Sequence, residues 1–224
     1  MSESLISRLK IVSIFIFLGF LMTLGMAATI FLNPGGGNLY EVRPIANVIA
    51  DLLTATPLDI TINLASLIFD NFFMIGYLSI FYGLYLVTKG KDELFARIAF
   101  LLGSVTFVSD MIENAIQAAL LTGVPNGWVP ADNVFSTFWA VMYLKDISSY
   151  MAGFVFIVML LVSFNNPPDF KEEKLIFIIL LGIYVILGVI AIIDPSLLVF
   201  RNLSFMVDLL IASILFRKMA SDLG

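Results

Sequence analysis

The chain of 224 residues contains neither cysteine nor histidine. The absence of cysteine excludes disulfide bonds and thiol chemistry, and the absence of both residues excludes haem and most zinc or copper sites. Charged residues make up only 13% of the chain, and they form no basic patch that would bind nucleic acid. We therefore expect no cofactor other than a hard cation such as Na⁺, Ca²⁺ or Mg²⁺, which oxygen ligands suit.

Hydrophobic residues, by contrast, make up 60% of the sequence and fall in six long apolar runs. Each run has about twenty residues or more, the length that a helix needs to cross a hydrocarbon core of about 30 Å. The sequence therefore predicts an all-α, polytopic membrane protein that forms a single integral membrane domain over residues 1–224. The predicted spans cover about residues 10–32, 58–88, 94–122, 135–164, 174–193 and 196–217.

The prolines mark the ends of these spans. All eight lie between the apolar runs or at a first helical position, where the missing N–H of proline is harmless. Thr56–Pro57 and Asp194–Pro195 each predict an N-cap followed by the first turn of a helix. Asp169 and the glutamate three residues later predict a capping box that opens the fifth span.

A short amphipathic helix is expected in the long connection of residues 33–57. Apolar residues recur there at helical spacing, at Ile45, Val48, Ile49, Leu52 and Leu53. Such a helix either covers the ends of its neighbours or gates a cavity.

Positively charged residues determine the predicted orientation. By the positive-inside rule, the side with more lysine and arginine is cytoplasmic. In the predicted topology the loops of one side carry Arg43 alone. The other side, which also holds both termini, carries Arg8, Lys10, Lys89, Lys91, Arg97, Lys171, Lys174, Arg217 and Lys218. We therefore expect cytoplasmic termini and a multi-pass protein of the plasma membrane, the inner membrane of a prokaryotic cell.

Four of the six spans carry ionisable groups, which are costly in a membrane. A charge at the centre of a membrane helix costs roughly 2.5–3.5 kcal/mol, so such groups usually face the interior of a protein. On the third span Asp110, Glu113, Asn114 and Gln117 are spaced i, i+3, i+4 and i+7, which places them on one face. Similar polar stripes occur on the second, fourth and sixth spans. We expect these four helices to form the core, and the first and fifth spans to flank it and face lipid.

The stripes contain more carboxylates than cations. Counted at about 1.5 Å per residue, most of the groups lie at a similar depth in the outer half of the bilayer. Like charges crowded in a low dielectric cannot all ionise, so the surplus indicates bound protons or a bound cation. Asp110 and Glu113, one turn apart, are the pair expected to share a proton. The candidate proton or cation ligands are Asp70, Asn71, Asp110, Glu113, Asn114, Asp146 and Asp208, and the cations beside them are Lys145 and Arg201.

These residues favour a small transporter or permease-like protein whose carboxylates bind protons or a hard cation. Asp110 and Glu113 would act as the coupling acids, while Lys145 and Arg201 would tune them or hold an anionic group. The expected partners are the lipid bilayer and a small solute or ion, and the oligomeric state is open.

Two other functions are also open. An intramembrane enzyme acting on a lipid or isoprenoid would use two carboxylates as general acid and base, with Lys145 or Arg201 holding a phosphate. The sequence shows no nucleophile–base pair and no aspartate-rich phosphate motif, so we lean against an enzyme. A non-catalytic subunit or sensor would use the polar residues only for interhelical hydrogen bonds, which average about 0.6 kcal/mol.

Overall fold

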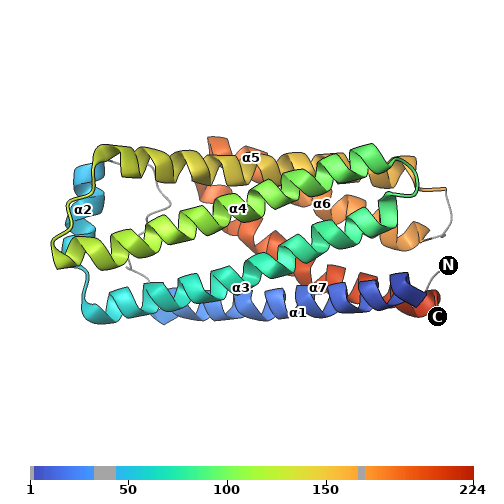
Figure 1. Cartoon of the computed structure of the whole chain (residues 1–224), viewed down its shortest axis with the longest axis horizontal. Coiled ribbons are helices and arrows are strands. Elements are labelled where there is room, and N and C mark those ends of the chain that lie inside the picture. The colour runs from blue at the N-terminus through green and yellow to red at the C-terminus, as the bar shows by residue number, and fades with distance from the viewer. Residues whose placement is uncertain (1–2, 33–43, 166–169) are drawn as a thin grey trace.

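Six long helices build the part of the chain that the computed structural model describes, residues 3–32, 44–165 and 170–224 (Figure 1). They are α1 (Glu3–Leu32), α3 (Pro57–Thr88), α4 (Glu93–Gly123), α5 (Asp132–Val162), α6 (Lys171–Ile193) and α7 (Leu198–Asp222). The shorter elements are α2 (Ile45–Thr54) and two single-turn 3₁₀-helices, η1 (Val124–Asn126) and η2 (Pro195–Leu197). The predicted all-α class is confirmed, with six helices long and apolar enough to cross a membrane.

Most of the predicted helix ends lie within three residues of the observed ones, whereas α1 starts seven residues before its predicted start and α7 ends five residues after its predicted end. At the start of α3 the Thr56 hydroxyl accepts a hydrogen bond from the backbone N–H of Asp59 (3.2 Å), and the Asp59 carboxylate accepts one from the N–H of Thr56 (2.8 Å). This capping box, with Pro57 at the first helical position, confirms the predicted N-cap. α5 starts at Asp132 and α6 at Lys171, each three residues before its predicted start.

The turn between α6 and α7 differs from the predicted one. Asp194 accepts hydrogen bonds from the hydroxyl (2.7 Å) and the backbone N–H (3.1 Å) of Ser196, and these bonds hold the pKa of the Asp194 carboxyl below its usual value. They stabilise η2, and the α-helix starts only at Leu198. Residues 194–197 must reverse the chain between two long helices, which favours the tighter 3₁₀ turn. Asp169, the predicted cap of the fifth span, lies outside the described residues.

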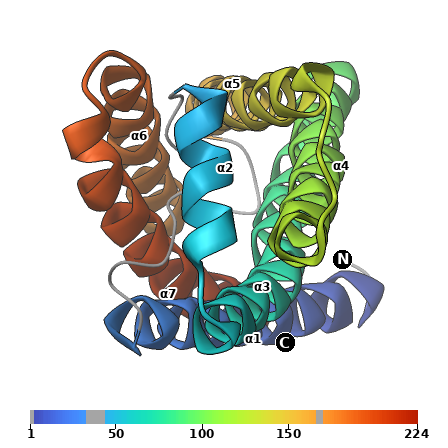
Figure 2. The same ribbon diagram turned by 90° about the vertical axis from the view of Figure 1, so that its left-hand side faces the viewer.

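The six long helices follow one another around a ring. α1 packs against α3, the order continues through α4, α5 and α6, and α7 completes the ring by packing against α1. Figure 2 shows this arrangement from one end of the bundle. In this ring α6 lies between α5 and α7, and α1 lies between α3 and α7. The first and fifth spans are thus members of the ring. The core of four polar-striped helices stays a prediction.

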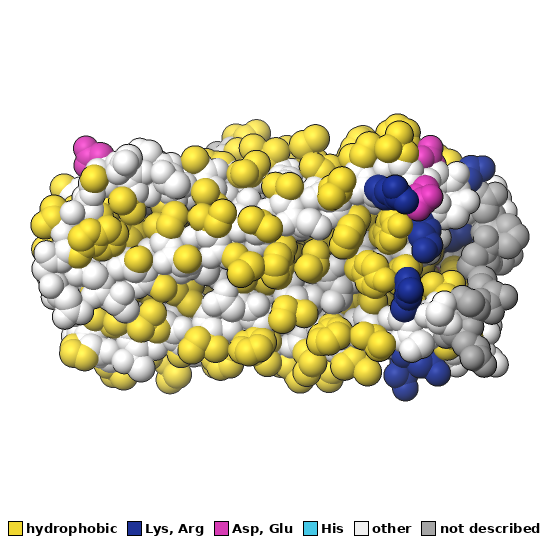
Figure 3. Space-filling model, in the orientation of Figure 1, with side chains coloured by type: hydrophobic (Ala, Val, Ile, Leu, Met, Phe, Trp, Pro, Cys, Tyr) yellow, Lys and Arg dark blue, Asp and Glu magenta, His cyan; other side chains and the backbone are white. Residues whose placement is uncertain are grey.

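The two chain ends lie at one end of the bundle, which we call the basic end (Figure 1). On the face that Figure 3 shows, lysine and arginine side chains gather at this end, beside a broad band of hydrophobic side chains. This distribution is the one that the positive-inside rule uses. The cytoplasmic position of the termini stays a prediction, and Arg43 lies outside the described residues.

The last two helices are shorter than the others. α6 and α7 have 23 and 25 residues, against 30–32 in the other long helices, which corresponds to about 35–38 Å of helix against about 45–48 Å. Lys218 Nζ lies 2.5 Å from Glu173 Oε1, and the buried Lys174 donates to the backbone oxygen of Ser163 (2.7 Å). These contacts hold the α6–α7 hairpin at the basic end, so its other end stops short of the ends of α3, α4 and α5 (Figure 1).

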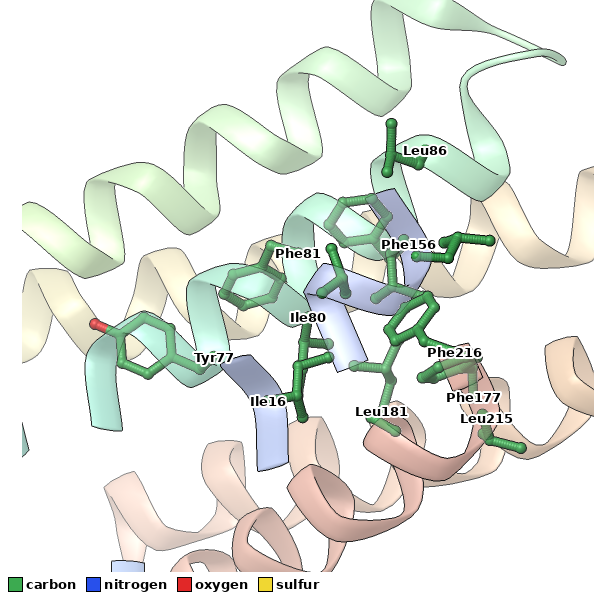
Figure 4. Packing of buried hydrophobic residues seen from close by; sticks show 14 of the residues in the cluster. Ile16, Tyr77, Ile80, Phe81, Leu86, Phe156, Phe177, Leu181, Leu215 and Phe216 are labelled. Atoms are coloured by element: carbon green, nitrogen blue, oxygen red, sulfur yellow. The ribbon is translucent and has the colours of Figure 1, made fainter. Parts of the chain in front are cut away.

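Two clusters of buried hydrophobic side chains fill the interior. The larger one, which we call the inner cluster, lies toward the basic end (Figure 4). In it Phe81 stacks on Phe156 with ring centroids 6.0 Å apart, and Phe177 packs against Phe216 at 4.9 Å. These large aromatic rings pack closely and fill the interior between the helices.

The smaller cluster, which we call the outer cluster, lies under α2 at the opposite end. Val48 and Leu52 of α2 are buried there together with Leu67, Leu120, Leu121, Val124, Phe135 and Phe138. The predicted amphipathic helix is therefore confirmed, and Figure 2 shows that α2 crosses the end of the bundle. α2 thus covers the helix ends, which is one of the two roles expected for it.

On α3, α4 and α5 the ionisable residues of the stripes fall between these two clusters along the chain, whereas α7 contributes only to the inner cluster. On α5, Lys145 lies between Phe138 of the outer cluster and Ala152 of the inner cluster. α3 and α4 repeat this order around Asp70 and Asp110. The stripes thus form one polar layer with apolar side chains on both sides.

Candidate functional site

Lys145 of α5 stands between two carboxylates of α4. Its Nζ lies 3.1 Å from Asp110 Oδ1 and 2.6 Å from Glu113 Oε2. The contact with Asp110 has the geometry of a hydrogen bond, whereas the contact with Glu113 is a close ion pair without it. Both carboxylates are almost completely buried. Asp110 and Glu113 therefore contact the same ammonium group, and the proton that they are expected to share stays a prediction.

Residues of α3 extend this group on its other side. The Tyr77 hydroxyl donates to Asp110 Oδ2 (3.0 Å), and the Asn114 amide donates to Asp70 Oδ2 (2.7 Å) and, over a longer distance, to Asn71 Oδ1 (3.3 Å). Asn71 itself is exposed, so its share in the site is small. We call the set of Asp70, Tyr77, Asp110, Glu113, Asn114 and Lys145 the carboxylate cluster.

Asp146 and Arg201 form a separate ion pair beside the carboxylate cluster. Arg201 Nη1 donates to Asp146 Oδ1 (3.0 Å) and to the Tyr150 hydroxyl (2.8 Å). Tyr184 of α6 extends this group, and its hydroxyl lies 2.8 Å from the hydroxyl of Ser149. Counted along its own span, Arg201 is nearer the outer end of its helix than the other groups are. It lies level with Asp146 because the α6–α7 hairpin is short at this end.

Asp208 stands apart from both groups. It is 6% exposed, and its Oδ2 has no hydrogen-bond partner among the described residues. An ion pair with Arg201, the partner that the shared stripe suggests, is not formed. Seven residues correspond to about 10 Å along the helix, and an arginine side chain points toward the N-terminus of its helix, away from Asp208. A cavity of about 20 Å³ lies beside Asp208, between Tyr77 and Tyr184.

The ion pairs of the site show where the excess carboxylates lie. The pair of Asp146 and Arg201 is neutral. The carboxylate cluster holds three carboxylates, Asp70, Asp110 and Glu113, and one cation, Lys145. Two of its carboxylates are therefore in excess, and Asp208 is a third excess carboxylate. If all of these groups were ionised, the interior would hold three net negative charges, which repel one another.

Several buried side-chain oxygens of the described residues receive no hydrogen bond. Among the described residues, buried oxygens without a hydrogen bond are found on Glu113, Asn114, Gln117 and Asp208. The first three lie on one face of α4 within little more than one turn. A buried acceptor without a partner costs about 1–3 kcal/mol, so this face is suited to a ligand that brings positive charge or hydrogens.

A preformed site for a metal held by three acidic side chains does not occur in the described residues. The carboxylates approach Lys145 and Asn114 and do not converge on one point. The hydroxyl groups of the layer are also engaged, because Thr106 contacts Ser148 (2.9 Å) and Ser149 contacts Tyr184. Neither hydroxyl pair includes the base that an activated nucleophile needs.

Replacement of Asp208 by leucine is expected to raise the free energy of unfolding by roughly 1–2 kcal/mol, because it removes an unsatisfied buried carboxyl group. Thermal or denaturant unfolding in detergent measures the change. Asp222→Leu, at an exposed position of the same helix, is the control and should leave the stability unchanged. If Asp208→Leu destabilises the protein as much as a lost ion pair would, Asp208 has a partner and the isolation inferred for it is wrong.

The comparisons with known proteins supply no function for this site. No protein-family model matches the chain, and no curated protein and no solved structure shows a significant similarity to it.

Proposed function

We propose that this protein is a small proton-linked membrane transporter whose coupling proton binds in the carboxylate cluster. One observation carries the proposal: Asp70, Asp110 and Glu113 stand against the single ammonium group of Lys145 in a layer with apolar clusters on both sides. Ionisable groups in such a position are expensive and commonly mark a proton or ion pathway.

A proton suits this cluster better than a divalent cation. Ca²⁺ takes about six to eight oxygen ligands and Mg²⁺ requires a near-ideal octahedron. The carboxylates of the described residues do not converge in that way. A proton needs one carboxyl oxygen, and the cluster offers several. A monovalent cation such as Na⁺ is the second candidate, because unpaired acceptor oxygens line one face of α4.

Glu113 is the coupling acid in this proposal. Asp110 has a second donor in the Tyr77 hydroxyl, whereas among the described residues Glu113 contacts only the ammonium group of Lys145. Protonation of Glu113 therefore removes its only strong partner contact and weakens the link between α4 and α5. In the charged state the ion pair draws these helices together across the polar layer.

The two apolar clusters supply the gates of this transporter. The inner cluster separates the polar layer from the basic end, and the outer cluster with α2 separates it from the other end. Opening one cluster at a time would give access to the proton site from one side only, which is what coupled transport requires. The link between Lys145 and Glu113 is the element whose strength changes with protonation.

The test uses the purified protein in proteoliposomes on a solid-supported membrane. A rapid pH jump should produce a transient charge movement with the unaltered protein, and Glu113→Gln should abolish it. The same liposomes are then screened for solute flux driven by a pH gradient, with a panel of anionic, cationic and neutral solutes. Any flux that appears should be lost in Glu113→Gln.

Glu93→Gln is the matched control. Glu93 is an exposed glutamate of the same helix and pairs with Arg97 at 2.7 Å, so its replacement should leave both signals intact. If Glu113→Gln is folded and keeps the full charge movement and flux, the proposed coupling role is wrong. The polar layer would then serve packing only.

A further inference from the structure

An open groove runs along the outer surface of the helix ring, between α1 and α7 at the basic end. Its volume is about 620 Å³, within the range of about 300–1,000 Å³ typical of small-molecule sites. The two helices are joined beneath it, where the Ser213 hydroxyl donates to the backbone oxygen of Ser13 (3.0 Å). This hydrogen bond holds α1 and α7 together at the groove.

The side chains of the groove change from apolar to polar toward the basic end. Phe17, Leu18 and Ile214 form the part farther from that end and are exposed. Arg217 follows about one turn after Ile214, at the depth where the apolar surface ends. This order, hydrocarbon first and cation last, matches the order of an acyl chain and its headgroup.

Arg217 is the cation of the groove that is available to a ligand. Lys218 is engaged with Glu173 (2.5 Å) and Glu172 (3.4 Å). Arg217 is exposed and has no ion-pair partner among the described residues. Asp222 also borders the groove, but it lies more than a turn beyond Arg217, toward the water outside the headgroup region.

We propose that this groove binds one anionic phospholipid from the membrane leaflet at the basic end. Its phosphate pairs with the Arg217 guanidinium, which suits phosphate oxygens geometrically, and an acyl chain lies along Phe17, Leu18 and Ile214. Basic pockets between membrane helices are a known mode of anionic headgroup binding. The site is separate from the carboxylate cluster and does not depend on the proposed transport.

The experiment places the full-length protein in nanodiscs of phosphatidylcholine with increasing fractions of phosphatidylglycerol. We expect phosphatidylglycerol to raise the unfolding temperature of the unaltered protein, and native mass spectrometry to show one retained molecule. Arg217→Gln should lose both effects. Ile214→Trp, which fills the groove and keeps the charge, should lose them as well.

Arg97→Gln is the matched control, because Arg97 is an exposed arginine at the same end of the bundle and borders no part of the groove. It should bind phosphatidylglycerol like the unaltered protein. Equal losses in Arg97→Gln and Arg217→Gln would show a general surface-charge effect and overturn the proposal. Equal stabilisation by glycerol phosphate would show a free-anion site, and retention of a second protein copy in place of lipid would show a dimer contact. Either result would also overturn it.

Discussion

Replacing Lys145 by methionine is expected to lower the free energy of unfolding by about 3–5 kcal/mol, the cost of breaking a buried ion pair from one side. Methionine keeps the unbranched shape of the side chain, is one atom shorter than lysine and removes the charge. Asp110 and Glu113 then remain in the polar layer without their shared cation, at distances where they repel each other. Chemical unfolding in detergent micelles, followed by circular dichroism, measures the loss.

The origin of this loss is tested by restoring the charge balance. In the triple variant Lys145→Met, Asp110→Asn and Glu113→Gln no ionised group is left at the contact, so most of the lost stability should return. Lys91→Met, at an exposed turn near the basic end, is the control and should have no effect. If the triple variant is as unstable as the single one, Lys145 acts through its packing and the electrostatic interpretation of the cluster is wrong.

The sequence predicts the helices of this protein well, because their determinants are local. A run of about twenty apolar residues has few alternatives to a membrane helix, and a proline after a threonine marks a helix start. The polar face of α4 was also predictable from the spacing of Asp110, Glu113, Asn114 and Gln117, all of which are buried. Each of these features depends on residues within one helix.

The pairing between helices was not predictable in the same way. The shared stripe on the sixth span suggests Asp208 as the partner of Arg201, whereas in the structure Arg201 pairs with Asp146. The choice depends on the shortness of the α6–α7 hairpin and on contacts at its far end, such as that of Lys218 with Glu173. Those contacts connect residues distant in the chain, and one sequence without relatives does not reveal them.

Tyr184 is a buried residue near the polar layer that the sequence did not identify. The fifth span lacks ionisable groups in its apolar part, so it was placed outside the core. The structure inserts it between α5 and α7, where the Tyr184 hydroxyl meets Ser149 and its ring packs on Phe205 (centroids 4.8 Å apart). An isolated tyrosine in an apolar run is compatible with lipid and with the interior, so hydropathy alone does not decide its position.

The excess carboxylates of the polar layer distinguish a packing role from a proton-binding role. The sequence gives five carboxylates against two cations, and the structure divides them into a neutral pair, a cluster with two carboxylates in excess and the isolated Asp208. A layer that served packing only would gain stability by losing its excess carboxylates. A layer that binds protons would lose its function when the excess carboxylates are removed. Stability and charge movement measured on the same variants therefore separate the two interpretations.

Replacing Gly76 by alanine is the change expected to disturb the helix ring most. Gly76 of α3 faces Gly19 of α1, and a β-carbon on either would lie 2.7 Å from the α-carbon of the other. Small residues allow membrane helices to approach closely in this way. The atom in the way belongs to a backbone, so no side chain can rotate to relieve the contact. We expect a loss of about 3 kcal/mol, at the upper end for overpacking, together with a separation of α1 from α3.

The matched control is Gly182→Ala, because a β-carbon at Gly182 in α6 would meet no atom within 4 Å. Both variants make the same chemical change in the middle of a membrane helix, so their difference isolates the contact between α1 and α3. Unfolding in detergent measures the stability, and a crosslink between cysteines introduced on these two helices reports their distance. Equal stability of the two variants would show that α1 and α3 do not approach as closely as the two glycines allow. With that approach, α1 is held against α3 on one side and α7 on the other, and the ring that surrounds the polar layer is complete.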